Sequence, residues 1–424
     1  MNISAPVIYY KINGQSPPPS LRILGLKHYM QSDMIRKVEF HFENHDQRLQ
    51  RTELKNLIAS GNKIQFSYGY INDVSQIYEY EIRGYKGNEV MKVIAYQKID
   101  ETTRSINFKK TKYSDVAKII AQKQGLKTDG IQDTKCAESQ FRQNKESDIK
   151  FLSKLAKKIH FEFGIDEDNL IFRERQYNGK ASHVFVDRGK TITSDVIKFT
   201  PALNTFQIPA GYEAVYINNK NANREKTEAN TSNVKRNLLG GNAGVAGLAS
   251  GSDGSQVGTK FKLGKPRKVI KQNKANLQIV SVKGKGLKVQ TVKRKQRSRK
   301  KKHQKCTTEG LFKAAEDTIF KAKLEVVGQP RLKDKELIEM QRVGVDNEGL
   351  WYVYDIINEV FISSAFISKI NLERNTVGFA KYTGVGKGSG RVQNNISGST
   401  KKPVSSRVPQ KKTLKTKKVT YTRR

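Results

Sequence analysis

The sequence has few cysteines and lacks any long apolar run. Cys136 and Cys306 stand far apart among 424 residues, so their spacing indicates neither a disulfide framework nor a zinc site, and we expect folding in a reducing cytoplasm. No stretch approaches the roughly 18 apolar residues that a membrane-spanning helix requires. The beginning, MNISAPVIYYKING, lacks a basic region followed by an apolar core, so we expect no signal peptide.

Sequence motifs of catalysis are also missing. Gly384–Gly390 contains glycines and a lysine, but its spacing is wrong for a phosphate loop, and it is typical of a flexible linker. His41 and His45 have a helical metal-ligand spacing, yet His41 belongs to an alternating strand pattern, so we predict no metal site. Glu162 and Asp166 flank a hairpin, where acids are usually solvated, so we do not predict a catalytic pair. We therefore predict no enzymatic activity and no cofactor; a peptidoglycan hydrolase would need a catalytic pair.

Acidic residues are almost absent from two segments. The whole chain has 79 Lys and Arg against 40 Asp and Glu, a net charge of +39. Residues 219–305 hold 24 basic and 3 acidic residues (24 − 3 = +21), and residues 384–424 hold 12 and none (+12). These two segments carry +33 of the +39, so the remainder of the chain is nearly ordinary in charge.

The sharpest chemical signal is a basic cluster within the first of these segments. Its members are candidates for contact with a polyanion or a protein partner: Lys293, Arg294, Lys295, Arg297, Arg299, Lys300, Lys301 and Lys302. Such a cluster binds phosphates by counterion release, without sequence specificity. Phe261 is the only aromatic residue in 219–305, so base stacking is not indicated. A solubilising or protein-facing role stays open beside the polyanion role.

The first hundred residues have a β pattern. Asn13-Gly14 is a strong turn pair, and alternating runs such as Lys37–Phe42 and Ile64–Tyr70 place apolar residues on one face. Strands at this spacing predict a small antiparallel barrel or sandwich over residues 1–100.

Residues 101–199 change to a mixed pattern. Ser114 is expected to cap a helix over Asp115–Gln124, with Gly125 as its stop. Ser147 is expected to cap a second amphipathic helix, which a hairpin of two strands follows near Phe161–Phe172. We predict an α+β middle domain.

A second β domain is predicted from residues 200–218 plus 308–381. The strand Glu213–Ile217 is expected to join the strands after residue 322, which makes residues 219–307 a basic low-complexity insertion. Within it, 219–258 is expected to be flexible, and two short alternating runs occur at Asn276–Val282 and Leu287–Val292. Residues 382–424 are expected to form a disordered basic tail.

The order of motifs resembles the late-control D family of phage baseplate hub proteins, which is related to the hub portion of type VI secretion spike proteins. The residues that carry the resemblance are Tyr113–Val116, Ile119–Ala121, Gly125-Leu126, Phe141–Asp148 (FRQNKESD), Phe151-Leu152, Leu155-Ala156, Phe161, Phe163, Leu170–Phe172, Phe199–Asn204, Gly328–Leu332, Val343–Val345 and Gly349–Val353. The resemblance covers roughly 1–218 and 308–378. It departs at Ile159-His160, where the family usually has a glycine, and it does not extend to the basic insertion and tail. No needle domain follows, so a separate spike protein is expected.

The resemblance implies a mostly β, α+β chain with two tube-like antiparallel β-barrel domains flanking the middle domain. It implies a homotrimer that forms a pseudo-hexameric ring, joins the tail tube to the central spike, and lies in the virion tail baseplate after assembly in the bacterial cytoplasm. Expected partners are the spike protein, tube or tube-initiator proteins and other baseplate proteins, with the tape-measure protein or DNA as contacts of the basic segments. The alternative function is nucleic-acid binding through the insertion and tail.

Overall fold

A computed structural model gives the fold. It describes residues 5–51, 54–97, 99, 102–135, 137–189, 194–203, 211–217, 224–230, 239, 277–282, 289–295, 301–317, 320–344 and 347–375. Residues 376–424 are not among the described residues.

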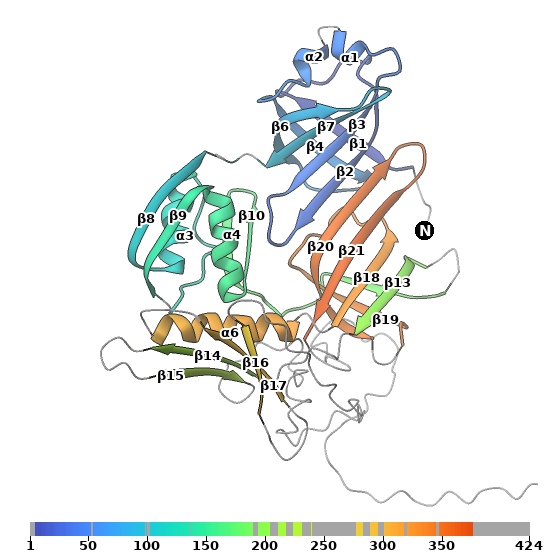
Figure 1. Ribbon diagram of the computed structural model, residues 1–424. Helices are drawn as coiled ribbons and strands as arrows, with labels where there is room; N and C mark the ends of the chain where they lie inside the picture. The colour runs from blue at the N-terminus through green and yellow to red at the C-terminus, as the bar shows by residue number, and fades with distance from the viewer. Residues whose placement is uncertain are drawn as a thin grey trace, which may run out of the picture. The chain divides into compact units, whose positions relative to one another are not determined.

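Most of the described chain is β structure, and 13 strands belong to one large sheet that is antiparallel at nearly every pairing (Figure 1). The N-terminal half-sheet has, in spatial order, β1 (Val7–Ile12), β4 (Lys63–Tyr70), β6 (Tyr78–Lys86), β7 (Val90–Gln97), β3 (Lys37–Glu43) and β2 (Ile23–Gln31). The C-terminal half-sheet continues with β20 (Gly349–Phe361), β21 (Phe366–Arg374), β18 (Phe320–Val327) and β13 (Val196–Leu203). Smaller members are β5 (Asp73–Val74), β12 (His183–Val186) and β19 (Leu337–Gln341), and the short helices α1 (Arg48–Arg51) and α2 (Leu54–Leu57) lie between β3 and β4.

The long strand β20 joins the two half-sheets. Its first residues pair with β19, and Asp355–Phe361 pair with Gly25–Gln31 of β2. Alternation along β20 places Ile356 and Val360 on the buried face, and Val360 belongs to the core of the N-terminal half-sheet. The sheet therefore passes from one half to the other without a break.

Phe366 closes the N-terminal core from the other half of the chain. It begins β21, yet its ring lies 5.6 Å from the Tyr68 ring and 5.7 Å from the Tyr70 ring, measured between centroids. Gly328 makes room for it, because a Cβ at that position would lie 2.0 Å from the Phe366 ring. Aromatic contacts of this kind contribute about 0.5–1.5 kcal/mol beyond their buried area.

The mixed region predicted between the β domains contains one hairpin, a second antiparallel strand pair and two helices. Its elements are β8 (Thr103–Lys112), α3 (Tyr113–Lys123), β9 (Ala137–Ser147), α4 (Asp148–Ile159), β10 (Phe161–Asp166) and β11 (Asn169–Glu174). Apolar positions at helical spacing in α4, including Leu152 and Leu155, pack with Phe163 and Phe172 of the β10–β11 hairpin.

The predicted helix ends are confirmed with one correction. The Ser147 side chain accepts a hydrogen bond from the Lys150 amide and caps α4, and Gly125 follows α3 with a φ of 70°. Ser114 is not a cap: α3 begins at Tyr113, and the Ser114 hydroxyl donates to Asp133 at 2.9 Å. The Ser114 amide in the first turn donates instead to the Thr134 hydroxyl at 3.0 Å.

Three strands of the basic insertion join β14 (Gly211–Ile217) in a four-stranded sheet, in the order β15 (Arg224–Asn230), β14, β17 (Val289–Lys295) and β16 (Leu277–Val282). The two alternating runs predicted inside the insertion are thus paired strands. The expectation for Glu213–Ile217 is wrong: β14 pairs with β15 and β17, and it is β13 that pairs with β18. Strands β14 and β17 run parallel, a long-range pairing that local patterns do not reveal.

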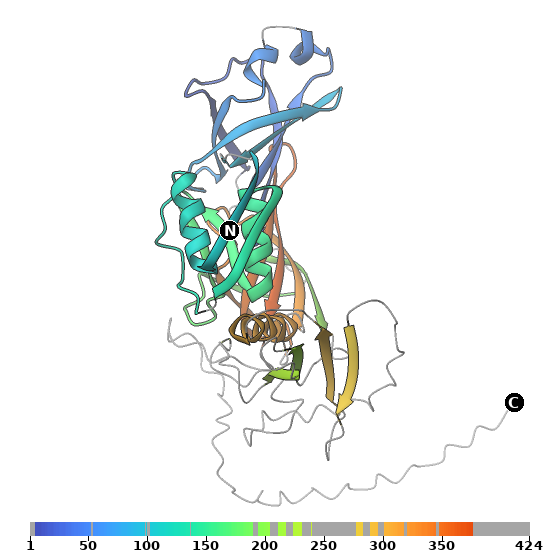
Figure 2. The same ribbon diagram turned by 60° about the vertical axis from the view of Figure 1, so that its left-hand side comes forward.

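Helix α6 (Lys301–Asp317) follows this sheet and packs against α4, as Figures 1 and 2 show. Cys306 on α6 is disulfide-bonded, which corrects the expectation from spacing, and Cys136 lies outside the described residues. Among the described residues, no helix is long and apolar enough to cross a membrane.

Candidate functional site

Three polar clusters and one cavity stand out where separate segments meet. The first cluster surrounds Arg36, between β2 and β3. Its guanidinium donates to Asp166 at 2.8 Å and to Asp334 at 2.7 Å. The Arg36 and Asp334 side chains are only 6% and 0% exposed, whereas Asp166 is 42% exposed. One buried cation thus links β2–β3, the β10–β11 hairpin and the loop before β19.

Burial and ion pairing oppose each other at Asp334. Burial raises the pKa of the Asp334 carboxyl, but Lys335 and Arg36 outweigh burial and hold that pKa well below its ordinary value. Lys335 fits here because Gly164 has no side chain: a Cβ on Gly164 would lie 2.8 Å from the Lys335 ammonium. The carboxylate is therefore ionised and held from two sides.

The second cluster is uncharged and crosses the β2–β20 junction. His28 contacts the Tyr68 hydroxyl through Nδ1 at 2.9 Å and the Tyr80 hydroxyl through Nε2 at 2.7 Å. Asn358 donates to the Tyr68 oxygen at 2.8 Å and accepts from Ser368 at 2.6 Å. Burial and the nearby Arg36 lower the pKa of His28 well below its ordinary value, so it is neutral. This network is structural, since every contact is internal.

The third cluster anchors the end of α6. Asp317 accepts from His160 Nε2 at 2.5 Å and from the Asn375 side chain at 2.9 Å. Arg175 lies 3.8 Å from the same carboxylate and donates to Glu373 at 2.5 Å. A buried acid at a helix C-terminus meets an unfavourable dipole, so these donors are what stabilise it there.

The structure corrects the prediction for the hairpin acids. Glu162 is not a solvated rim residue: it is buried, accepts from Arg173 at 2.6 Å and accepts from the Tyr352 hydroxyl at 2.5 Å. Asp166 is partly exposed and paired with Arg36. An alternating pattern gave the strand but not what packs over it, because Tyr352 lies 190 residues away in sequence.

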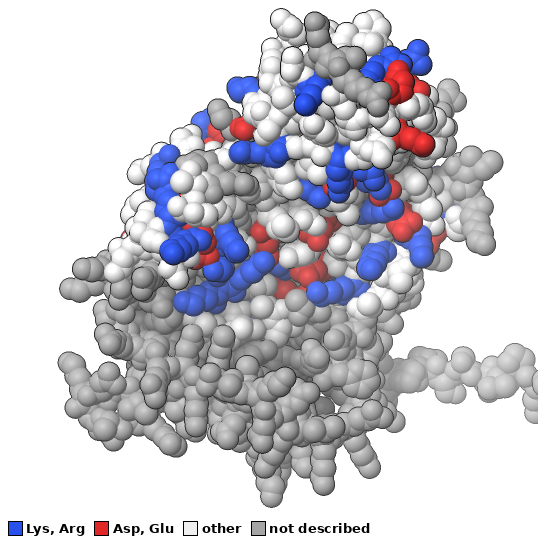
Figure 3. Space-filling view, turned by 45° about the horizontal axis from the view of Figure 1, so that its top comes forward, with Lys and Arg blue, Asp and Glu red and all other residues white. Residues whose placement is uncertain are grey.

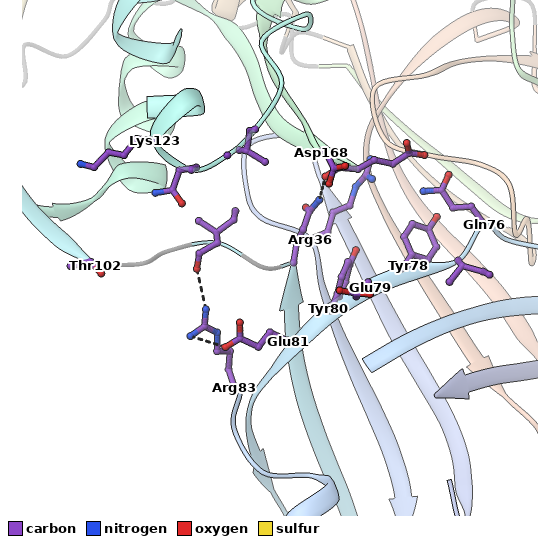
Figure 4. Close-up of a pocket in the computed structure, with 17 residues that line it drawn as sticks. Arg36, Gln76, Tyr78, Glu79, Tyr80, Glu81, Arg83, Thr102, Lys123 and Asp168 are labelled. Atoms are coloured by element: carbon purple, nitrogen blue, oxygen red, sulfur yellow. Dashed lines mark hydrogen bonds and ion pairs between the residues drawn. The ribbon is translucent and has the colours of Figure 1, made fainter. Parts of the chain in front are cut away.

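The cavity, of about 1020 Å³, lies between β6, the end of α3 and the β10–β11 turn (Figure 4). Its lining residues are Arg36, Gln76, Ile77, Tyr78, Glu79, Tyr80, Glu81, Arg83, Gln97, Ile99, Thr102, Lys123, Gln124, Gly125, Leu126, Glu167 and Asp168. No local sequence pattern indicated this cavity, because its wall residues come from five separate segments.

The predicted basic cluster is divided by the structure. Lys293, Arg294 and Lys295 lie in β17, and Lys301 and Lys302 begin α6. The remaining three members, Arg297, Arg299 and Lys300, lie outside the described residues. On the face drawn in Figure 3, the described lysines and arginines lie among aspartates and glutamates.

Residues able to hold a metal do not gather in the part of the chain that is described: no group of three His, Cys, Asp or Glu side chains forms there. His41 lies in β3, as its alternating pattern predicted, and its ring meets Phe361 edge-on at 5.4 Å between centroids.

Solved structures share this architecture. A tail protein from Neisseria meningitidis MC58 superposes with a TM-score of 0.53 and 8% identity, over 87% of this chain and 96% of that chain. The 43 kDa tail protein of prophage MuSo2 from Shewanella oneidensis gives 0.53 and 9%, over 87% and 98%. The chain has the fold of phage tail proteins. This fold agrees with the resemblance to phage tail proteins that the order of motifs indicated. Neither a family model nor a curated protein matches the sequence.

Proposed function

We propose that the chain is a structural baseplate hub protein of a contractile phage tail or a related injection system. It forms a trimeric, pseudo-hexameric ring that joins the tail tube to the central spike. The observation that carries the proposal is the joined sheet, in which β20 holds two half-sheets together. Each copy would bring two β units to a ring, so three copies would bring six. The fold shared with two tail proteins, one of them from a prophage, supports the same role.

The two ends of the large sheet differ in how open they are to a neighbouring strand. At one end, β13 carries Lys198, Pro201 and a register irregularity at Ile197. All three features hinder pairing with a further strand. At the other end β1 also carries an exposed lysine, Lys11, but it has no proline and no register irregularity, and it pairs only with β4 among the described strands. Its Tyr9 is 53% exposed. We infer that the open edge at β1 is covered by another subunit in the ring.

This role is mechanical and requires no catalytic step. The partners are two further copies of the chain, the spike protein, the tube or tube-initiator proteins and other baseplate proteins, in the virion tail. Light scattering and negative-stain images of the purified chain test the proposal. A trimer with a threefold ring and an axial hole supports it; a stable monomer that never co-purifies with tail particles contradicts it.

Nucleic-acid binding is a second candidate, favoured by the +21 charge of residues 219–305 and the +12 charge of residues 384–424. Removing residues 387–424 and changing Arg297, Arg299 and Lys300 to Gln separates the two functions. Nucleic-acid binding is favoured if the parent gives a steeply salt-dependent gel shift that the variant loses, and neither protein forms a trimer. The hub is favoured if both proteins form the same trimer and neither gives a gel shift.

A further inference from the structure

The cavity beside β6 has its cations already paired. Arg36 is engaged by Asp166 and Asp334. Arg83 lies 3.4 Å from Glu81 and donates to the Ile99 carbonyl at 3.1 Å. Lys123 lies 3.9 Å from the buried Asp148. The positive charge of the cavity wall is therefore used within the fold and does not favour an anionic ligand.

Several side-chain acceptor oxygens in the same wall receive no hydrogen bond from the described residues. Glu167 and Asp168, on the β10–β11 turn, are exposed, and neither carboxylate has an ion pair within the described part of the chain. Gln97 donates to the Glu167 carbonyl at 3.2 Å, but its own Oε1 is shielded from solvent and receives no hydrogen bond from the described residues. The C-terminal end of α3, which carries partial negative charge, adds to the wall at Gln124 and Gly125. A ligand that brings donors and positive charge fits these groups.

An apolar contact point lies in the same cavity. Ile77 is 74% exposed, the most exposed large apolar side chain among the described residues. Ile99 and Leu126 also line the cavity. The volume of about 1020 Å³ has room for several residues of a peptide. A single metal ion or a small anion would leave most of this space and its apolar part unfilled.

We propose that this cavity binds a basic segment of a protein chain. Lysine or arginine side chains donate to Glu167 and Asp168, while an apolar side chain of the segment covers Ile77 (Figure 4 shows the wall). The inference does not depend on the hub role, because it uses only the groups that face the cavity.

A labelled peptide tests the proposal with the full-length chain. The probe is VKRKQRSRKKK, the sequence of residues 292–302, and the control peptide has every lysine and arginine replaced by glutamine. Fluorescence anisotropy should show binding of the basic peptide, weakening as salt is added, and no binding of the control. Absence of binding by the basic peptide at low salt would overturn the proposal.

Two double variants test where the peptide binds. Glu167→Gln with Asp168→Asn should weaken binding by about threefold to tenfold, as expected for two partly exposed ion pairs. The matched control, Glu89→Gln with Asp129→Asn, makes the same charge change at exposed positions outside the cavity lining and should leave affinity within about twofold. Equal weakening in both variants would mean that the peptide follows total charge, and would overturn the site.

The apolar contact is tested separately. Ile77→Lys places a cation in the cavity and should weaken binding at least about fivefold, whereas Ile71→Lys, at a side chain 66% exposed and outside the cavity, should not. Thermal unfolding of all variants checks that the fold is retained. If Ile77→Lys binds as well as the Ile71 control, the peptide lies elsewhere and the proposal is wrong.

Discussion

At the residue scale, the charged groups that matter most to this fold are buried ones that link distant segments. Arg36, Asp334 and Glu162 are all at most 6% exposed, and each pairs with a residue more than ten positions away. Removing one partner of such a buried pair costs more stability than removing one partner of a surface pair, because it leaves an uncompensated charge in a poorly solvated place. They specify which segments meet.

Replacing Arg36 tests this directly. Arg36→Met should lower the free energy of unfolding by about 3–5 kcal/mol, since Asp334 would lose one of its two cations while staying buried. The control is Arg22→Met, whose side chain is 73% exposed and 3.6 Å from Glu43, and which should cost less than about 1 kcal/mol. Urea unfolding of both variants measures the difference; similar losses would show that the Arg36 cluster contributes no more than a surface pair.

The carboxyl of Asp355 should make the stability of the fold depend on pH. Burial raises the pKa of its carboxyl to about 6, although the Ser32 amide donates to it at 3.3 Å. Because the folded pKa lies above the ordinary value of 3.8, the folded state holds the proton more tightly. The contribution of Asp355 to stability therefore falls as pH rises from about 4 to about 6, and stays low above that.

Asp355→Asn removes this titration and keeps an oxygen for the Ser32 amide. The variant should be more stable than the parent at pH 7.5 and no more stable at pH 4, as measured by urea unfolding at both values. A gain of the same size at both pH values would mean that ionisation of Asp355 is not the cause.

At the element scale, two features fix the position of α6. They are its close contact with α4 and the left-handed residue at the end of α4. A Cβ on Gly310 of α6 would lie 2.7 Å from both the Cα and the carbonyl carbon of Ile159, the last residue of α4. His160 then ends α4 in the left-handed conformation, with φ of 57°, where the resembling family usually has glycine. His160 takes this conformation while contacting Asp317, so the exit of α4 and the end of α6 are tied to each other.

Gly310→Ala should therefore reverse the usual effect of this change in a helix. Alanine normally favours a helix over glycine by about 1 kcal/mol, but here the backbone of α4 occupies the space, and we expect a loss of about 1–3 kcal/mol. Gly84→Ala, at a position with no atom within 4 Å of the added Cβ, is the steric control. Thermal unfolding distinguishes them, and a stabilised Gly310 variant would show that α6 does not pack this closely.

At the scale of the whole molecule, the large sheet has one protected end and one open end. The open end at β1 is the place where we expect a neighbouring copy, and the protected end at β13 is not. The contrast lets the proposed ring be tested without disturbing the core, because Tyr9 is exposed on its strand.

Tyr9→Lys should weaken the trimer by placing a charge at the covered edge, and light scattering over a dilution series should show dissociation at a concentration at least about tenfold higher than for the parent. Ile119→Lys is the matched control, since Ile119 is 47% exposed on α3, away from the sheet. If Tyr9→Lys leaves the mass at every concentration unchanged, β1 is not the subunit contact of the proposed trimer.

The sequence by itself determined the local elements. Alternation gave β3 and β4, helical spacing with Ser147 gave α4, and the order of these patterns gave the resemblance to tail hub proteins, because period, cap and turn signals are local. Only the tertiary structure decided that Glu162 is buried under Tyr352 and that β14 pairs with β17. It alone brought Glu167, Gln97 and Ile77 to one cavity. These contacts join residues far apart in the chain, and their energies depend on burial and on partners that no short stretch of sequence contains.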